Sequence, residues 1–154
     1  DTRFYAPVPQ STLTIPSTAS KVITVGAYNN VYDSYADFSG RGYPDEGVLN
    51  GSRESSAFYE AGQTVKPDLV APGVGIRTLR VGGGVEYVSG TSFATPFVTG
   101  AAALLMEWGI VQGNDPYLYG EKVKAYLRRG ARPLRGERKL PNARVGDNGI
   151  IVSS

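Results

Sequence analysis

The sequence predicts a domain that combines buried strands with helices. Three observations predict it: a β-branched, nearly continuous apolar run at residues 21–28, a second short apolar run within 66–76, and a long helical segment that begins near Ser92. Continuous apolar strands are typical of parallel sheets that are covered on both faces. The 154 residues suit one domain and are enough to bury a real core.

The elements before the long helix are separated by turn-forming residues. Polar residues and three prolines predict a loop over 1–20, and Pro44, Gly47 and Gly51 predict a surface loop over 43–63. We expect a buried strand at 21–28, a short strand and turn at 33–42, a short strand within 66–76, and a hairpin over 76–90 that bends at Gly82–Gly84.

Two helices are predicted after the hairpin. From Ser92 to Trp108 the apolar residues occur all round the helix, which indicates a helix inside the protein, and Gly109 is expected to end it. A second helix is expected over 120–129, with Gly130 ending it. Its apolar face carries Val123, Tyr126 and Leu127.

Composition restricts the chemistry that the chain can perform. It contains neither cysteine nor histidine. The lack of cysteine excludes disulfides, thiolate zinc sites and a cysteine nucleophile, and with no histidine either we expect no ordinary transition-metal site. The sequence establishes no cofactor; only an oxygen-ligated ion such as a structural calcium stays open. No run reaches the roughly 18 uninterrupted apolar residues needed to span a bilayer, and we expect no membrane partner.

The excess of Lys and Arg lies after residue 116, in the run YLRRGARPLRGERK at 126–139. Such a run can form a surface for nucleic acid or another anion. No aromatic residue follows Tyr126, so no platform for stacking bases is available. We interpret the run as a solvated helix end and loop, and expect no nucleic-acid partner.

The polar cluster Ser-Gly-Thr-Ser at 89–92 stands at the mouth of the long helix. A serine there has two explanations: it can cap the helix, or it can be a nucleophile whose developing oxyanion is stabilised by free backbone N–H groups and the helix dipole. Gly90 favours close approach of a substrate. The pattern G-T-S-x-A-x-P-x-V-x-G over 90–100 favours the nucleophile.

That pattern resembles the serine-nucleophile motif of the subtilisin-like serine proteases, the subtilases of peptidase family S8. GTSFATPFVTGAAAL, IPSTASKVITVGAYN, FSGRG and KPDLVAPGVGI all match elements of the family in its order. The segments TSFATPFVTGAAALLMEWGI and YGEKVKAYLRRGA are most similar to the germination-protease-like subtilases of Firmicutes. Phe97 stands where many members have a non-catalytic histidine, and the tail DNGIIVSS also departs from the family.

The resemblance implies an α/β fold: the C-terminal half of a subtilisin-like domain, with a mainly parallel sheet and helices on both faces. We expect one partial domain, with a loop at 1–20, strands and loops at 21–90, the nucleophile helix and the following helix at 91–130, and a C-terminal extension at 131–154. The family's catalytic Asp and His and its oxyanion Asn precede the matched region. The chain is therefore expected to be a fragment, inactive alone, whose partner is the N-terminal half of the same domain.

The resemblance also assigns roles to individual residues. Ser92 is the expected nucleophile of a serine endopeptidase, forming an acyl-enzyme, and its backbone N–H supplies half of the oxyanion hole. The expected contacts to a peptide or protein substrate come from the residues beside the nucleophile and from the wall of the pocket for the residue before the scissile bond. These residues are Thr14, Ile15, Gly90 and Thr91.

Three other functions stay open: a catalytically dead subtilase that acts in binding or signalling, a sedolisin-type acid peptidase whose motif also contains S-G-T-S, and a structural domain with a capping Ser92. A Ser–Lys pair would need one of the lysines 21, 66, 122, 124 or 139 beside Ser92. Asp45 and Glu46 are interpreted as loop charges, with calcium ligands as the alternative. Asp68 is expected to bond local backbone N–H groups where a strand begins.

The long helix would expose a wide apolar face without the other half. Association of the fragment, including a homodimer, is therefore expected. The sequence predicts a bacterial protein; a secreted or spore-associated location stays open.

Overall fold

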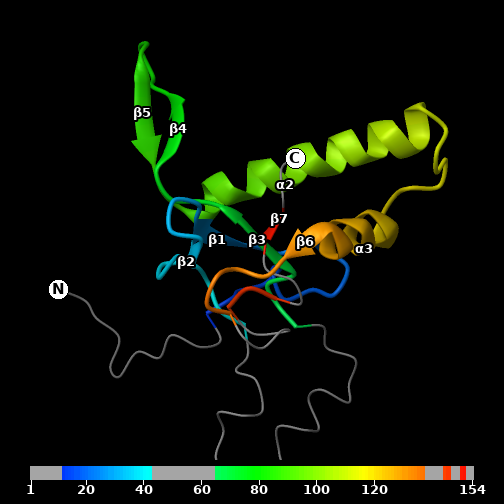
Figure 1. The fold of residues 1–154 in the computed structure, drawn as a ribbon, viewed down its shortest axis with the longest axis horizontal. Coiled ribbons are helices and arrows are strands. Elements are labelled where there is room, and N and C mark those ends of the chain that lie inside the picture. Colours follow the sequence, from blue (N-terminus) through cyan, green and yellow to red (C-terminus); the bar gives the residue numbers. More distant parts are fainter. Residues whose placement is uncertain (1–11, 43–64, 138–143, 147–149, 152–154) are drawn as a thin grey trace, which may run out of the picture.

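The computed structural model describes residues 12–42, 65–137, 144–146 and 150–151. Two sheets and two long helices make up this part of the chain (Figure 1). The strands are β1 (Val25–Asn29), β2 (Ser34–Tyr35), β3 (Leu69–Pro72), β4 (Ile76–Leu79), β5 (Val85–Val88), β6 (Ala131–Arg132) and β7 (Ile150–Ile151). The helices are α2 (Thr91–Met106), a π-helical turn η1 (Glu107–Val111) and α3 (Glu121–Gly130).

The main sheet has the strand order β2-β1-β3-β7-β6. Its centre is parallel: β1 pairs with β3, with Val25 opposite Leu69, and β3 pairs with β7. Both margins are antiparallel, because β2 follows β1 through a tight turn and β6 pairs with β7 in the opposite direction. The α/β class and the buried strands are as predicted, but the sheet is mixed.

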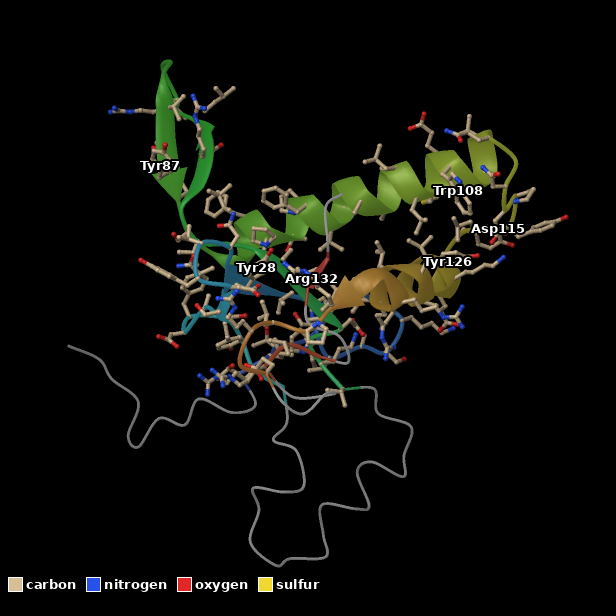
Figure 2. All side chains as sticks on the ribbon, viewed as in Figure 1. Tyr28, Tyr87, Trp108, Asp115, Tyr126 and Arg132 are labelled. Atoms are coloured by element: carbon tan, nitrogen blue, oxygen red, sulfur yellow. The ribbon has the colours of Figure 1, made fainter. Side chains whose placement is uncertain are left out.

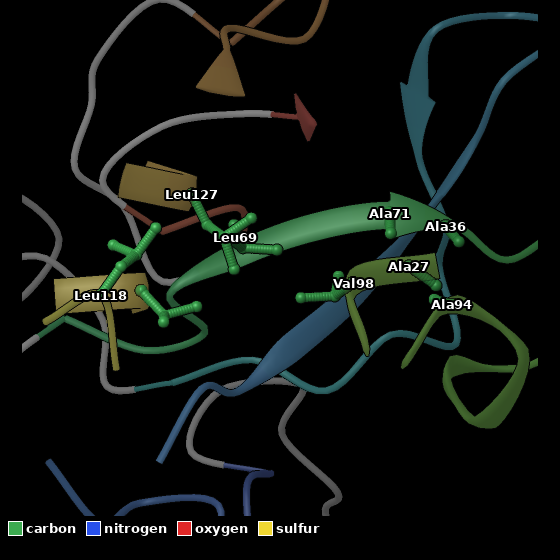
Figure 3. Packing of buried hydrophobic residues seen from close by; sticks show 9 residues of the cluster. Ala27, Ala36, Leu69, Ala71, Ala94, Val98, Leu118 and Leu127 are labelled. Atoms are coloured by element: carbon green, nitrogen blue, oxygen red, sulfur yellow. The ribbon is translucent and has the colours of Figure 1, made fainter. Parts of the chain in front are cut away.

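Alanines on the central strands allow α2 to lie close to the sheet. Ala27 and Ala71 on the strands and Ala94 on the helix are fully buried, with Val98 one turn further on (Figure 3). The same cluster continues to α3 through Leu127. Small side chains at a helix–sheet contact permit this close packing, which places the first turn of α2 directly over the strands.

Both helices pack on one face of the sheet in the described residues, whereas the prediction of helices on both faces concerns the whole subtilisin-like domain. Successive strand residues point to opposite faces, and Tyr28 and Val70 belong to a second cluster with Leu134 and Val145. In the described residues the second face is therefore covered by the segment after α3, not by a helix.

In this chain α2 is not buried all round, as expected for this helix without the other half of the domain. Only a stripe of the helix faces the core, through Ala94 and Val98. Away from this stripe, Phe97 is 48% exposed and Leu104 is 69% exposed. The described residues provide a packing layer on one side of α2 alone, so the rest of its apolar surface meets solvent.

Gly109 does not end the helix as predicted. The helical chain continues through η1, which contains Gly109. The glycine instead allows close packing, because a Cβ at this position would lie 2.5 Å from Cδ2 of Leu118. By length and composition the combined segment Thr91–Val111, with mean hydropathy 1.3, is sufficient to cross a bilayer. The expectation that no segment qualifies was based on unbroken apolar runs. One such helix is weak evidence, because core helices of soluble proteins meet the same criterion.

The predicted hairpin forms β4 and β5, which project away from the sheet beside the start of α2 (Figure 1). Tyr87 of β5 points away from the main body (Figure 2) and is 73% exposed. The bend contains three glycines with positive φ, Gly82–Gly84, a conformation that L-residues rarely adopt.

Candidate active site

In space, the first residue of helix α2 lies beside the end of β3, although β4 and β5 come between them in the sequence. The N–H of Gly90 donates to the carbonyl oxygen of Gly73 over 2.8 Å, and the N–H of Gly73 donates to the carbonyl oxygen of Tyr28 over 3.0 Å. These two bonds connect the first turn of α2 to both central strands. Carboxyl ends of parallel strands are where open α/β sheets bind their ligands.

Ser92 does not cap this helix. Gly90 occupies the N-cap position, no side chain caps the helix, and Ser92 is the second helical residue. Within the described part of the chain, its exposed hydroxyl makes no hydrogen bond. The N–H groups of a first helical turn lack intrahelical acceptors, and the helix dipole makes this end positive. The arrangement leaves a free hydroxyl beside free backbone donors.

The neighbouring hydroxyls are engaged locally. The Ser89 hydroxyl accepts the N–H of Gly75 over 2.9 Å and so closes the base of the hairpin. The Thr95 hydroxyl donates to the carbonyl oxygen of Thr91 over 3.0 Å, one turn back along the helix. Of the two serines at the helix mouth, Ser89 is therefore structural and Ser92 is available for chemistry.

Ser92 is one of the residues that line a cavity of about 420 Å³. Its walls come from the loop before β1, from the start of β1 and from the first turn of α2. The lining residues are Thr12, Leu13, Thr14, Pro16, Ser17, Val22, Ile23, Thr24, Val25, Gly40, Thr91, Ser92 and Thr95. Among the described residues the lining carries many hydroxyls and no charged side chain, so this part of the cavity suits an uncharged group.

The structure brings three of the five expected site residues to this cavity: Thr14, Thr91 and Ser92. Ile15 lies outside the lining and is 89% exposed, and Gly90 contributes the N-cap instead. Sequence reasoning missed several lining residues. Thr95 could have been found, because it lies three residues after Ser92 on a helix and shares its face; the approach of the segments containing Thr12 and Val22 has no local signal.

No lysine lines the cavity, which removes a Ser–Lys pair among the described residues. Burial lowers the pKa of Lys66, against the opposing effect of its bond to Asp68. That ammonium group is nevertheless occupied, since it contacts Asp68 at 2.7 Å and the carbonyl oxygen of Val22 at 2.8 Å. Lys139 lies outside the described residues.

Asp68 bonds backbone at a strand start, as expected, although across strands rather than locally. Its carboxylate accepts the N–H of Thr24 over 2.7 Å, just before β1. Among the described residues no group of three acidic side chains could hold a metal ion. Asp45 and Glu46 lie outside the described residues, so the calcium alternative gains no support.

Comparison with known proteins gives one consistent relationship. Residues 5–148 match the model of the subtilase family. The serine protease AprX of Bacillus subtilis is 32% identical over 140 residues, covering 82% of this chain. Pyrolysin of Pyrococcus furiosus is 37% identical over 134 residues, covering 79% of this chain.

Solved structures agree. The CspB protease of Clostridium perfringens has a TM-score of 0.79 and 41% identity over 97% of this chain. The patellamide maturation protease PatA has a TM-score of 0.63 and 31% identity over 94% of this chain. The chain spans only part of these relatives: 28% of AprX, 9% of pyrolysin, 28% of CspB and 44% of PatA.

Proposed function

The chain belongs to the subtilase family of serine proteases, as its motifs predict, and from that premise we propose that it carries the nucleophile of a serine endopeptidase, Ser92. The similarity to CspB agrees with the germination-protease-like subgroup expected from the sequence. The observation that supports the role of Ser92 most strongly is its free, exposed hydroxyl in the first turn of α2, beside a cavity.

The proposed reaction proceeds through an acyl-enzyme. The Ser92 oxygen bonds to the carbonyl carbon of the scissile peptide, and its proton passes to a histidine base. The N–H of Ser92 donates to the oxyanion that forms. The amide C–N bond then breaks, the leaving amine takes the proton from the histidine, and water hydrolyses the ester.

The histidine must come from outside this chain, because the chain contains none. We infer that it comes, together with an orienting aspartate and an oxyanion asparagine, from an N-terminal portion of the same catalytic domain. The complete fold would then have the mainly parallel sheet with helices on both faces that the family resemblance implies. Without a base a serine hydroxyl is a weak nucleophile, so the chain alone is inactive in this proposal.

The substrate is a peptide or protein whose side chain before the scissile bond enters the cavity beside Ser92. Thr14 on the wall and Thr91 at the helix start contact it, and Gly90 leaves space for its backbone. The uncharged, hydroxyl-bearing lining supports an uncharged side chain at this position. Ile15 points outward and would meet substrate only beyond the cavity.

Labelling with a fluorophosphonate, which reacts only with an activated serine, tests the proposal. We expect intact mass to show one adduct on the full-length protein, none on its Ser92→Ala variant and none on the isolated chain. Ser89→Ala is the matched control, because it removes a neighbouring hydroxyl outside the cavity, and its labelling is expected to persist. A full-length protein that takes no label would be a catalytically dead homologue. Labelling of the isolated chain would refute the inference that this chain alone has no base to activate Ser92.

A further inference from the structure

Three charged side chains form a buried cluster outside the cavity lining. Asp68 is 1% exposed, and Lys66 and Lys124 are 6% exposed each. The two ammonium nitrogens lie 2.7 Å from different carboxylate oxygens of Asp68. Lys66 and Asp68 lie just before β3, whereas Lys124 comes from α3. The cluster therefore connects the second helix to the strand that supports α2.

The cluster holds one positive charge more than negative charge, and backbone carbonyls compensate for the difference. Lys124 donates to the carbonyl oxygens of Ser20 and Val22, at 2.7 and 3.1 Å. Lys66 donates to the same carbonyl of Val22, at 2.8 Å. The Asp68 oxygen nearest Lys124 has no partner in hydrogen-bond geometry, so that contact is an ion pair. Lys124 directs its hydrogen bonds to the segment 20–22.

That segment leads directly into the cavity wall. Asp68 accepts the N–H of Thr24, and the N–H of Asp68 donates to the carbonyl oxygen of Thr24 over 2.9 Å. The hydroxyl of Thr24 donates to the carbonyl oxygen of Ser17, and the N–H of Ser17 donates to that of Thr14 over 2.7 Å. Thr14, Ser17, Val22 and Thr24 all line the cavity.

We propose that Lys66, Asp68 and Lys124 position the cavity wall of residues 14–24 opposite Ser92, and thereby set which substrate side chains the cavity admits. This inference rests on the proposed peptidase function. The three residues are positioning residues, since none of them lines the cavity.

Directional bonding distinguishes this cluster from ordinary packing. Apolar side chains of similar volume could hold α3 against the strands without the cost of burying charges. They could not hold the carbonyl oxygens of Ser20 and Val22, which need donors when removed from water. The start of α2 depends on different contacts, through Gly73, Ala94 and Val98. Loss of the cluster is therefore expected to move the wall while Ser92 stays in place.

Lys124→Met in the full-length protein tests this separation, with Lys122→Met as the matched control. Lys122 lies on the same helix and forms an ion pair with Asp115 at 2.6 Å, but its side chain is 46% exposed. Loss of one partner of a buried charge pair is strongly destabilising. We expect amide hydrogen exchange in residues 14–24 to accelerate on the order of 10- to 100-fold in Lys124→Met, by a larger factor than in residues 94–105, with the control unchanged in both segments.

Peptide substrates that differ only in the residue before the scissile bond provide the functional measurement. In Lys124→Met we expect the ratio of kcat/KM between a small and a bulky side chain to change about three- to tenfold, mainly through KM. A lower fraction of folded enzyme would reduce the apparent kcat/KM for every substrate by the same factor and leave their ratio unchanged. A uniform reduction, or unchanged exchange in residues 14–24, would overturn the proposal.

Lys66→Met provides a second variant if Lys124→Met does not fold. It removes the other ammonium group, which donates to the carbonyl oxygen of Val22, but leaves Asp68 paired with Lys124, and the same change in substrate ratio is expected. Fluorophosphonate labelling separates the two levels of inference. If the full-length protein takes no label, the peptidase function is contradicted, and hydrogen exchange in residues 14–24 still tests the positioning role of the cluster. If the protein is labelled and active but the substrate ratios do not change, only the positioning role is contradicted.

Discussion

The N–H of Gly90 donates to the carbonyl oxygen of Gly73 over 2.8 Å, and this bond fixes the start of α2 to the end of β3. Gly73 is confined: a Cβ there would lie 2.6 Å from Cβ of Ala27 and 3.0 Å from the carbonyl oxygen of Gly90. The strand, the helix start and Ser92 thus depend on a position with no space for a side chain.

Gly73→Ala is expected to destabilise the chain by about 1–3 kcal/mol, because strand and helix must separate to admit the methyl group. Gly100→Ala is the control within α2, where a Cβ meets nothing within 4 Å. Alanine there should stabilise the isolated chain by about 0.5–1 kcal/mol through helix propensity. Urea unfolding measures both, and equal midpoints for wild type and Gly73→Ala would contradict the close contact.

Leu118 is fully buried against Gly109, at the turn between the helices. Leu118→Ala should lower the free energy of unfolding by about 2–5 kcal/mol, because it removes buried apolar atoms and leaves a cavity. Leu79→Ala in β4 removes the same atoms from a side chain that is 83% exposed. Its effect on the isolated chain should stay within about 0.5 kcal/mol. Thermal or urea unfolding of the two variants gives the comparison, and similar losses would contradict the assigned burial.

Asp115 lies beside Lys122 and Tyr126 where the connection from η1 reaches α3 (Figure 2). The hydrogen bond from Lys122 holds the pKa of Asp115 below its ordinary value of 3.8. A lowered carboxyl pKa contributes stability above the unfolded value, and this is lost as pH falls through the folded value.

Wild type should therefore be more stable than Asp115→Asn at neutral pH, and the difference should shrink only below pH 3.8. Unfolding free energies measured from pH 7 downwards check this. A difference that stays constant into strong acid would mean that Asp115 acts through packing instead of charge.

The exposed apolar side of α2 is expected to associate when the chain is isolated. Phe97→Ser and Leu104→Ser should shift the isolated chain towards monomer in gel filtration, because both side chains lie on this side of α2. Val31→Ser changes an apolar residue that is 77% exposed on a different surface and should leave the elution volume unchanged. A wild-type chain that elutes as a stable, soluble monomer would refute the association.

Local patterns predicted much of the fold. The apolar runs located β1 and β3, the triple glycine located the hairpin bend, and the face of Val123 and Leu127 is buried in α3 as expected. The errors have long-range causes. Gly109 was interpreted as a helix end, although it provides space for Leu118, nine residues later. The exposed side of α2 was expected from the family resemblance, which assigns the missing covering layer to the other half of the domain, and not from the helical pattern itself.

The sequence by itself determined the family and Ser92 as the candidate nucleophile, because the motif over residues 90–100 requires only neighbouring residues in a fixed order. The tertiary structure alone decided that Gly90 caps α2, that the Ser92 hydroxyl is free, and that Thr14 shares its cavity. It alone joined Lys124 to the carbonyl of Ser20, 104 residues away in the chain. Such contacts arise when separate elements pack, and spacing within one element carries no information about the partner it meets.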